Sequence, residues 1–478
     1  MRLVPEGITV RAMTTKTETP ANRIEFDAEL IQRYAGSGPR YTSYPTAMEF
    51  TPAVNEKIYA DWVRESNRIG RPLSLYVHVP FCAHVCYYCA CNKVVTANRD
   101  KADPFLENLY REIRLQASLV DPSRRVEQLH WGGGTPTFLS DQQLCDLMRV
   151  IGENFYLHED DQGEYSIEID PRELRGDTLS VLREVGFNRV SLGVQDFNPD
   201  VQVAVHRVQS NEQTLGALNQ ARKLGFRSIN IDLMYGLPLQ SVASFSATLD
   251  AVIDARPDRL SVFNYAHLPE RFKPQRRINS IDLPSPGDKL KILSLTIDKL
   301  TSAGYEYVGM DHFALADDEL VSAQRTGTLH RNFQGYSTHA ESDLIAMGPS
   351  AISAMPGGYS QNHTNLDDYY RDLQESRLPV ARGVAVNRDD RLRADVIQQL
   401  ICNNRLDTRR LEQDFGIDFE QYFASELAAL SGMQADGLVD TDSDSLTISA
   451  RGRLLVRNIC KVFDGYRRDE DKKFSKMI

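Results

Sequence analysis

The sequence predicts an α/β fold: an incomplete (βα) TIM-like barrel of parallel strands with an N-terminal arm and a mostly helical C-terminal domain. Apolar strand-like segments alternate with amphipathic helical segments between residues 71 and 375, which is typical of parallel strands joined by right-handed crossovers. Six or seven such units in about 240 residues fit a barrel or partial barrel. No Gly-x-Gly-x-x-Gly follows the first strand, which weighs against a dinucleotide-binding sheet.

The barrel region contains seven predicted strands, each rich in apolar, β-branched or aromatic residues and bounded by turn residues. In chain order they cover residues 73–80, 126–133, 165–170, 189–195, 228–236, 259–266 and 305–313. Helical periodicity predicts helices near residues 103–119, 140–154, 172–186, 210–224, 242–255 and 286–303.

Three further regions flank the barrel. Residues 1–24 are polar and aperiodic and predict a flexible extension, whereas residues 25–70 form an arm with a short helix and the aromatic stretch GPRYTSYPTA. Residues 376–478 predict three helices, a small hairpin and a last helix, as in a winged-helix module, before a solvated tail. A winged-helix module binds DNA in some proteins, but a module that serves as a lid over the barrel mouth would explain the same sequence pattern equally well.

Composition excludes several classes of partner. The 478-residue chain has a formal charge of −11 and no long basic tract, so a nucleic acid or an anionic membrane has no electrostatic support. No apolar run approaches the roughly 18 residues that a membrane-spanning helix needs. The N-terminus lacks the pattern of a secretory signal, so we expect a cytoplasmic, reducing location in which clustered cysteines indicate metal or redox chemistry.

The stretch FCAHVCYYCACNK, residues 81–93, holds four of the seven cysteines. A structural zinc site usually joins two separated pairs of ligands, whereas one ten-residue loop cannot join distant segments. An iron–sulfur cluster is larger, and its irons can each take a thiolate from such a loop. The sequence therefore favours an iron–sulfur cluster in this loop over zinc or a disulfide, and three thiolates with an open position would leave one of the four cysteines as a surplus thiol.

Unusual polar residues collect where the predicted strands end. They are the cysteine loop, Gly132–Thr135, Glu168 with Asp170, Gln195, Asp232, Tyr265–His267 and Asp311 with His312. In barrels of this type the catalytic residues lie at the C-terminal ends of the strands. This rim is therefore the predicted active site.

Two carboxylates are predicted to face the barrel interior. Glu168 lies between Ile167 and Ile169, and Asp232 lies between Ile231 and Leu233. Because side chains alternate along a strand, the acidic residues point inward if the apolar ones face the outer helices. An inward charge needs a partner, and an internal salt bridge or a ligand's ribose or ammonium group would serve.

The spacing Cys-x3-Cys-x2-Cys, with the aromatic Tyr88 before the third cysteine, matches the radical S-adenosylmethionine signature. Further segments resemble one family within it, the oxygen-independent coproporphyrinogen III oxidases of haem biosynthesis. They are YVHVPFCAHVCYYCACNKVVT, LHWGGGTPTFL, SIEIDPREL, GFNRVSLGVQDFN, NIDLMYGLP, DRLSVFNYAHLP, GMDHFA, GPRYTSYPTA and HRNFQGYST. The resemblance runs from about residue 26 to the end of the chain.

This resemblance implies an enzyme that decarboxylates two propionate side chains of coproporphyrinogen III to vinyl groups, giving protoporphyrinogen IX. It implies one [4Fe-4S] cluster held by Cys82, Cys86 and Cys89. The S-adenosylmethionine on the open iron would be surrounded by Tyr76, Gly133, Glu168, Ala266 and Ile352. A second S-adenosylmethionine would be held by Tyr88, Gly134, Thr135, Gln195, Arg207 and Asp232.

The resemblance also implies an electron donor and an acceptor, neither of which the sequence identifies, and a monomer. Arg40 is a candidate contact for a substrate propionate. Cys91 is expected to be a non-ligand, because a fourth thiolate would close the iron that must bind S-adenosylmethionine; a part in electron or hydrogen transfer and a packing thiol remain open. The alternative function is a haem-delivering chaperone, but such relatives lack the fourth cysteine and the GPRYTSYPTA arm.

Overall fold

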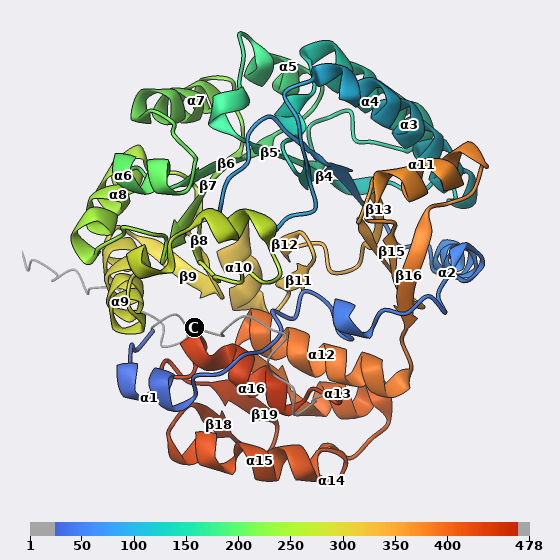
Figure 1. Ribbon diagram of the computed structural model, residues 1–478. Coiled ribbons are helices and arrows are strands. Elements are labelled where there is room, and N and C mark those ends of the chain that lie inside the picture. The colour runs from blue at the N-terminus through green and yellow to red at the C-terminus, as the bar shows by residue number, and fades with distance from the viewer. Residues whose placement is uncertain (1–23, 467–478) are drawn as a thin grey trace, which may run out of the picture.

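The computed structural model describes residues 24–466. In this part of the chain a 12-stranded sheet runs in the order β16-β15-β14-β13-β1-β4-β5-β6-β7-β8-β10-β9 and curves into an open barrel (Figure 1). Its parallel core consists of β1 (Leu73–Val79), β4 (Val126–Gly133), β5 (Glu164–Ile169), β6 (Arg189–Gln195), β7 (Ser228–Tyr235) and β8 (Arg259–Asn264). Because β16 and β9 are unpaired ends, the barrel is not closed, and the predicted fold class is confirmed.

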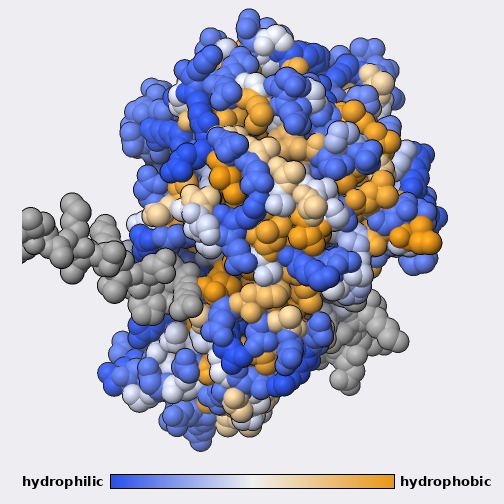
Figure 2. Space-filling view, turned by 90° about the vertical axis from the view of Figure 1, so that its left-hand side faces the viewer, coloured by the Kyte–Doolittle hydropathy of each residue, from blue (hydrophilic) through white to orange (hydrophobic). Residues whose placement is uncertain are grey.

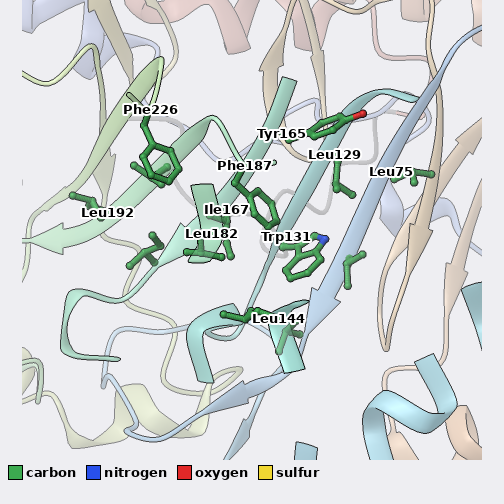
Figure 3. Close-up of a cluster of buried hydrophobic side chains, with 14 of the residues drawn as sticks. Leu75, Leu129, Trp131, Leu144, Tyr165, Ile167, Leu182, Phe187, Leu192 and Phe226 are labelled. Carbon is green, nitrogen blue, oxygen red and sulfur yellow. The ribbon is translucent and has the colours of Figure 1, made fainter. Parts of the chain in front are cut away.

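Helices cover the outer face of the parallel strands (Figure 1). They are α3 (Ala102–Leu119), α4 (Asp141–Asn154), α5 (Thr178–Glu184), α6 (Pro199–Ala204), α7 (Asn211–Lys223), α8 (Val242–Ala255) and α9 (Pro286–Ser302). Figure 3 shows the apolar layer between β4, β5 and these helices, in which Trp131 and Phe187 meet edge to face at 4.9 Å. This burial of the outward-facing side chains fixes which residues of each strand face the interior.

The seventh predicted strand, residues 305–313, is wrong as a single strand. The segment forms β9 (Tyr305–Gly309) and β10 (His312–Leu315), an antiparallel pair in which β10 lies between β8 and β9. The chain reverses at Gly309 and Met310, whose φ angles are +151° and +52°. A strand cannot continue through such angles, so Asp311 lies in a turn rather than at a strand end.

The opposite edge of the sheet contains strands that the sequence did not indicate. β13 (Asp343–Met347) pairs in parallel with β1, and β14 (Ile352–Met355), β15 (Gly358–Asn362) and β16 (Val380–Ala385) follow it in antiparallel order. α11 (Leu366–Gln374) connects the last two. The sheet thus continues beyond residue 375, where the boundary of the barrel region was expected.

The C-terminal module begins at residue 388. Its elements are α12 (Arg388–Asn403), β17 (Arg405–Asp407), α13 (Thr408–Phe415), α14 (Phe419–Tyr422), α15 (Ala424–Ala435), β18 (Val439–Thr441), β19 (Ser445–Ile448) and α16 (Val456–Val462). Its apolar core merges with residues of β9, β10 and α10 (Glu319–Thr326). The module therefore packs against the β9 end of the barrel and not over the cysteine loop (Figure 1).

The N-terminal arm, with α1 (Ala28–Arg33) and α2 (Glu56–Ile69), runs between this module and the barrel. Arg457 of α16 donates from Nε to the Pro39 carbonyl over 2.9 Å, and Asn458 donates to the Tyr34 carbonyl over 2.7 Å. The expected flexible extension and the solvated tail lie outside the described residues, apart from Ile24. Among the described helices, none combines the length and apolar character needed to cross a membrane.

Candidate active site

The cysteine loop lies between two short strands, β2 (Phe81–Cys82) and β3 (Val94–Val95), which pair in parallel. A turn in which Cys89 N donates to the Cys86 carbonyl over 3.2 Å brings these two thiols together. Cys82, Cys86, Cys89 and Cys91 all line one cavity of about 170 Å³. Every cysteine in residues 24–466 is a free thiol.

The donor set fits an iron–sulfur cluster better than one metal ion. Within the described chain, no three His, Cys, Asp or Glu side chains are placed to hold a single ion. The thiols instead open onto a shared cavity beside polar and charged side chains, as a multi-iron group with thiolate ligands requires.

The glycine turn after β4 approaches the cysteine loop closely. Gly133 has a φ of +107°, and a Cβ there would lie 2.5 Å from the His78 ring; a Cβ on Gly134 would lie 2.6 Å from the Phe81 carbonyl oxygen. Thr135 follows and directs its hydroxyl at Cys82 Sγ over 3.6 Å. Only glycine permits this approach of two backbones, which leaves main-chain groups at the cavity wall.

Glu168 and Asp232 line the cavity, so their predicted inward orientation is confirmed. Glu168 accepts hydrogen bonds from Gly133 N over 3.2 Å and from His130 Nε2 over 3.3 Å. Burial raises the pKa of Glu168, but these donors outweigh burial and lower it overall.

Asp232 accepts hydrogen bonds from Ser191 and Asn230, each over 2.8 Å. Burial and then the negative charge of Glu168 raise its pKa to about 6. Glu168 and Asp232 thus differ in acidity, because Glu168 has strong donors and Asp232 is buried beside an anion.

Two arginines stand behind Cys86. Arg207 directs Nη1 at Cys86 Sγ over 3.4 Å and at Asp170 Oδ2 over 3.0 Å, while Arg172 directs Nη2 at the same atoms over 3.5 and 2.7 Å. Burial raises the pKa of Asp170, but Arg207 and Arg172 outweigh it and bring it to about 2. Arg207 Nε is buried and has no hydrogen-bond partner, so this guanidinium retains a donor for a ligand.

Cys91 lines the same cavity, beside Lys93, whose ammonium donates to the carbonyls of Cys89 and Cys91 over 3.3 and 3.4 Å. A hydrogen bond with Cys91 lowers the pKa of Cys89 and raises that of Cys91. The structure thus places Cys91 beside Cys89 at the cavity, and its expected part as a non-ligand stays a prediction.

Of the remaining predicted residues, Tyr76, Ile352 and Arg40 lie outside this cavity. Gln195 lines the cavity with a left-handed φ of +69°. Gln275 ties the backbone of two others together, because its Nε2 donates to the carbonyls of Tyr88 and Ala266 over 2.9 and 3.2 Å. Tyr76 and Ile352 line a separate cavity of about 150 Å³ that also contains His78.

Arg40 lies away from the cysteines. It pairs with Asp311, and its guanidinium stands 5.8 Å from the ring centre of Phe263. Phe263 lines a third cavity, of about 310 Å³, which shares Glu168, Ser191 and Asp232 with the cysteine cavity. The arm thus reaches a large polar chamber that adjoins the cysteine site.

Sequence reasoning missed several residues that build the site. His130, Arg172 and Gln275 each contact a predicted site residue through a side chain. His130 lies two residues before the glycine turn and Arg172 two residues after Asp170, and this proximity was the only signal. Gln275 gave none, because it lies in a loop far along the chain.

Comparison with known proteins identifies the family. The model of the radical SAM superfamily matches residues 76–252, and that of the HemN C-terminal domain matches residues 386–455. The oxygen-independent coproporphyrinogen III oxidase of Pseudomonas aeruginosa is 55% identical over 443 residues, covering 93% of this chain and 96% of that protein. The chain belongs to the family of oxygen-independent coproporphyrinogen III oxidases.

Other members of the oxidase family agree. That of Salmonella typhimurium is 52% identical over 458 residues, covering 95% of this chain and 99% of the relative. The solved structure of coproporphyrinogen III oxidase (HemN) from Escherichia coli, described as a radical SAM enzyme, matches with a TM-score of 0.89 at 50% identity and covers 93% of this chain and all of that one. These relatives are oxidases and not haem chaperones, and the radical SAM family implies a [4Fe-4S] cluster with S-adenosylmethionine.

Proposed function

We propose that this chain carries out the oxygen-independent decarboxylation of two propionate side chains of coproporphyrinogen III to vinyl groups, giving protoporphyrinogen IX. The observation that carries the proposal is the cavity in which four thiols, the glycine turn, three carboxylates and Arg207 meet. When bound, the cluster and S-adenosylmethionine supply a 5′-deoxyadenosyl radical able to take hydrogen from a propionate carbon.

The protein's part is to bind and orient these groups. Cys82, Cys86 and Cys89 hold the cluster, and Thr135 and Arg207 donate hydrogen bonds to its thiolates, which stabilise negative sulfur. The glycine turn offers its backbone to the methionine end of a cofactor.

Two molecules of S-adenosylmethionine are part of the proposal. The one on the open iron would be held by Tyr76, Gly133, Glu168, Ala266 and Ile352. The second contacts Tyr88, Gly134, Thr135, Gln195, Arg207 and Asp232. The free Arg207 Nε suits a cofactor carboxylate, because a guanidinium binds such groups with two parallel donors.

In this proposal the reacting side of the substrate lies where the 310 Å³ chamber and the cysteine cavity share Glu168, Ser191 and Asp232. Phe263 and Tyr336 give the chamber aromatic walls, and Arg40 of the arm stands beside Phe263. A propionate that approaches Arg40 would compete with Asp311 for the guanidinium, so Arg40 is the proposed anchor for a carboxylate that does not react.

Anaerobic conversion tests this function. Reconstituted protein with S-adenosylmethionine, dithionite and coproporphyrinogen III is expected to form protoporphyrinogen IX, with a product mass lower by two CO₂ and four hydrogen atoms in all. Cys82→Ser is the matched inactive control, and Cys145→Ser on α4 the matched active one. Absence of product from well-reconstituted protein would contradict the proposal.

A further inference from the structure

A basic surface lies directly outside the cysteine loop, on a chain whose overall charge is −11. The segment between residues 270 and 277 holds four cations and one carboxylate. Lys273, Arg276 and Arg277 of this segment are exposed, and none of them has a carboxylate within ion-pair distance among the described residues. We call these three residues the basic edge.

The basic edge is joined to the cysteine loop by direct contacts. Arg277 lies over the Tyr87 ring at 5.2 Å, and His206 stacks on that ring at 5.0 Å. Gln275, between the three cations, donates to the Tyr88 carbonyl over 2.9 Å. Tyr87 and Tyr88 separate Cys86 from Cys89 in sequence, so this surface is one residue layer from two of the three thiols.

Exposed apolar side chains accompany the basic edge. Of the nine large hydrophobic residues exposed in the described part of the chain, four are Val203, Val208, Leu239 and Ile281, with 65%, 63%, 50% and 84% of their surface accessible. Their segments pack on one small core that also contacts Tyr87 and Tyr88. Figure 2, which views the side carrying α6 and α8, shows such orange residues interrupting a mostly blue surface.

Exposed apolar side chains with cations around them are typical of a protein-docking surface. The charge specifies the partner, because a positive patch on a negative protein attracts an acidic protein and repels a basic one. The position of the basic edge indicates the role of the partner, because the groups behind this surface are the thiols of the proposed redox cluster. We infer that the basic edge and its four apolar neighbours form the docking site of an acidic electron-carrier protein.

The partner carries a reduced one-electron cofactor, a flavin or an iron–sulfur centre. On docking, its cofactor loses one electron, which passes through the layer of Tyr87 and Tyr88 to the group held by Cys82, Cys86 and Cys89. No bond forms or breaks and no proton moves in this step. The inference rests on the proposed function, since only a redox group behind this loop requires a reductant.

The test compares two reductants on the reconstituted holoenzyme. Dithionite needs no docking surface, whereas a reduced flavodoxin, an acidic flavoprotein, does. The variant combines Lys273→Glu and Arg276→Glu in one protein. Arg277 is left unaltered because its guanidinium stacks on Tyr87 of the cysteine loop. The control is Lys57→Glu with Arg64→Glu, two exposed cations on α2, on the opposite side of the barrel from α6 (Figure 1).

We expect flavodoxin to reduce the cluster of the variant about tenfold more slowly than that of the unaltered protein, the lower range for lost electrostatic steering. Added salt should slow the reaction of the unaltered protein and the control but leave the variant nearly unchanged. Ile281→Asp should also slow the reduction by flavodoxin, because this exposed side chain belongs to the docking surface. It carries no catalytic contact. With dithionite, all four proteins should form product at the same rate.

Equal flavodoxin rates in the variant and the control would overturn the inference, as would a salt-independent rate in the unaltered protein. A dithionite-driven rate that falls as far as the flavodoxin rate would overturn it too, because the residues would then act in folding or catalysis. Failure of the proposed function is distinct: dithionite would give no product, while bleaching of the cluster by flavodoxin still reports on docking.

Discussion

Asp170 and Arg207 form a buried ion pair of 3.0 Å directly behind Cys86, whose sulfur the same guanidinium contacts over 3.4 Å. The pair joins the end of β5 to the segment after α6, so the sheet fixes a cation against the thiol of a proposed cluster ligand. Because Arg207 Nε stays buried and unpaired, the arginine has both a structural partner and a free donor.

Arg207→Gln removes this cation while Arg172 still neutralises Asp170. We expect the protein to bind one S-adenosylmethionine instead of two, measured by equilibrium dialysis of the reconstituted enzyme. The free energy of unfolding, measured with urea, should fall by about 2 to 3 kcal/mol, which is at the lower end for a broken buried ion pair. Arg175→Gln, at an exposed arginine of the loop that holds Arg172, should change neither quantity. Two bound molecules in Arg207→Gln would refute the assignment.

The cysteines of the loop are expected to divide into two kinds. Cys82→Ser, Cys86→Ser and Cys89→Ser should each abolish the visible absorbance of the reconstituted cluster, because each removes a ligand. Cys91→Ser should keep that absorbance, since its thiol serves only as a neighbour of Cys89. Loss of the cluster in Cys91→Ser, or its retention in all three other variants, would contradict the ligand set.

Gly133→Ala tests the close approach of the glycine turn to β1. A Cβ at this φ of +107° would lie 2.5 Å from the His78 ring, so we expect a loss of about 1 to 3 kcal/mol from backbone strain alone. Weaker binding of S-adenosylmethionine should accompany it. The control is Gly216→Ala in α7, where a Cβ meets nothing within 4 Å, and it should stabilise the protein by about 0.5 to 1 kcal/mol. Urea unfolding measures the stability of both variants. Equal effects of the two substitutions would contradict the close approach at Gly133.

The carboxyl group of Glu112, on α3, should make the free energy of unfolding depend on pH. It is buried and accepts hydrogen bonds from Gly348 N over 2.8 Å, Asn362 Nδ2 over 2.6 Å and the Tyr369 hydroxyl. Burial raises its pKa to about 7 despite these donors. A raised pKa means that the folded protein binds this proton more tightly than the unfolded chain does. The contribution of protonated Glu112 to stability is therefore full below the pKa of the unfolded chain and is lost as the pH rises through 7.

Glu112→Gln should remove that slope. Between pH 6 and pH 8.5 the unaltered protein should lose about 1 kcal/mol of unfolding free energy relative to the variant. Urea unfolding at the two pH values measures the difference, with the exposed Glu107→Gln of the same helix as the control. Parallel pH profiles for the unaltered protein and Glu112→Gln would show that this carboxylate is ionised throughout.

The sequence predicted most of the parallel core because each strand there buries an apolar face that leaves a clear periodicity, as Ile167 and Ile169 do around Glu168. The turn at Gly309 and Met310 was missed because β-forming residues continue on both sides of it. β13 was missed because its pairing with β1 is long-range, and β14 to β16 extend the sheet from β13. Contacts such as Arg172 with Cys86 depend on loop packing, which a local pattern does not encode.

The most direct test of the central claim is the stoichiometry of the anaerobic reaction. Protein reconstituted with iron and sulfide is given S-adenosylmethionine, a reductant and coproporphyrinogen III, and both products are followed in time. We expect 5′-deoxyadenosine to rise in step with protoporphyrinogen IX, and neither to form with Cys82→Ser. Tight binding of haem with no formation of protoporphyrinogen IX would contradict the account.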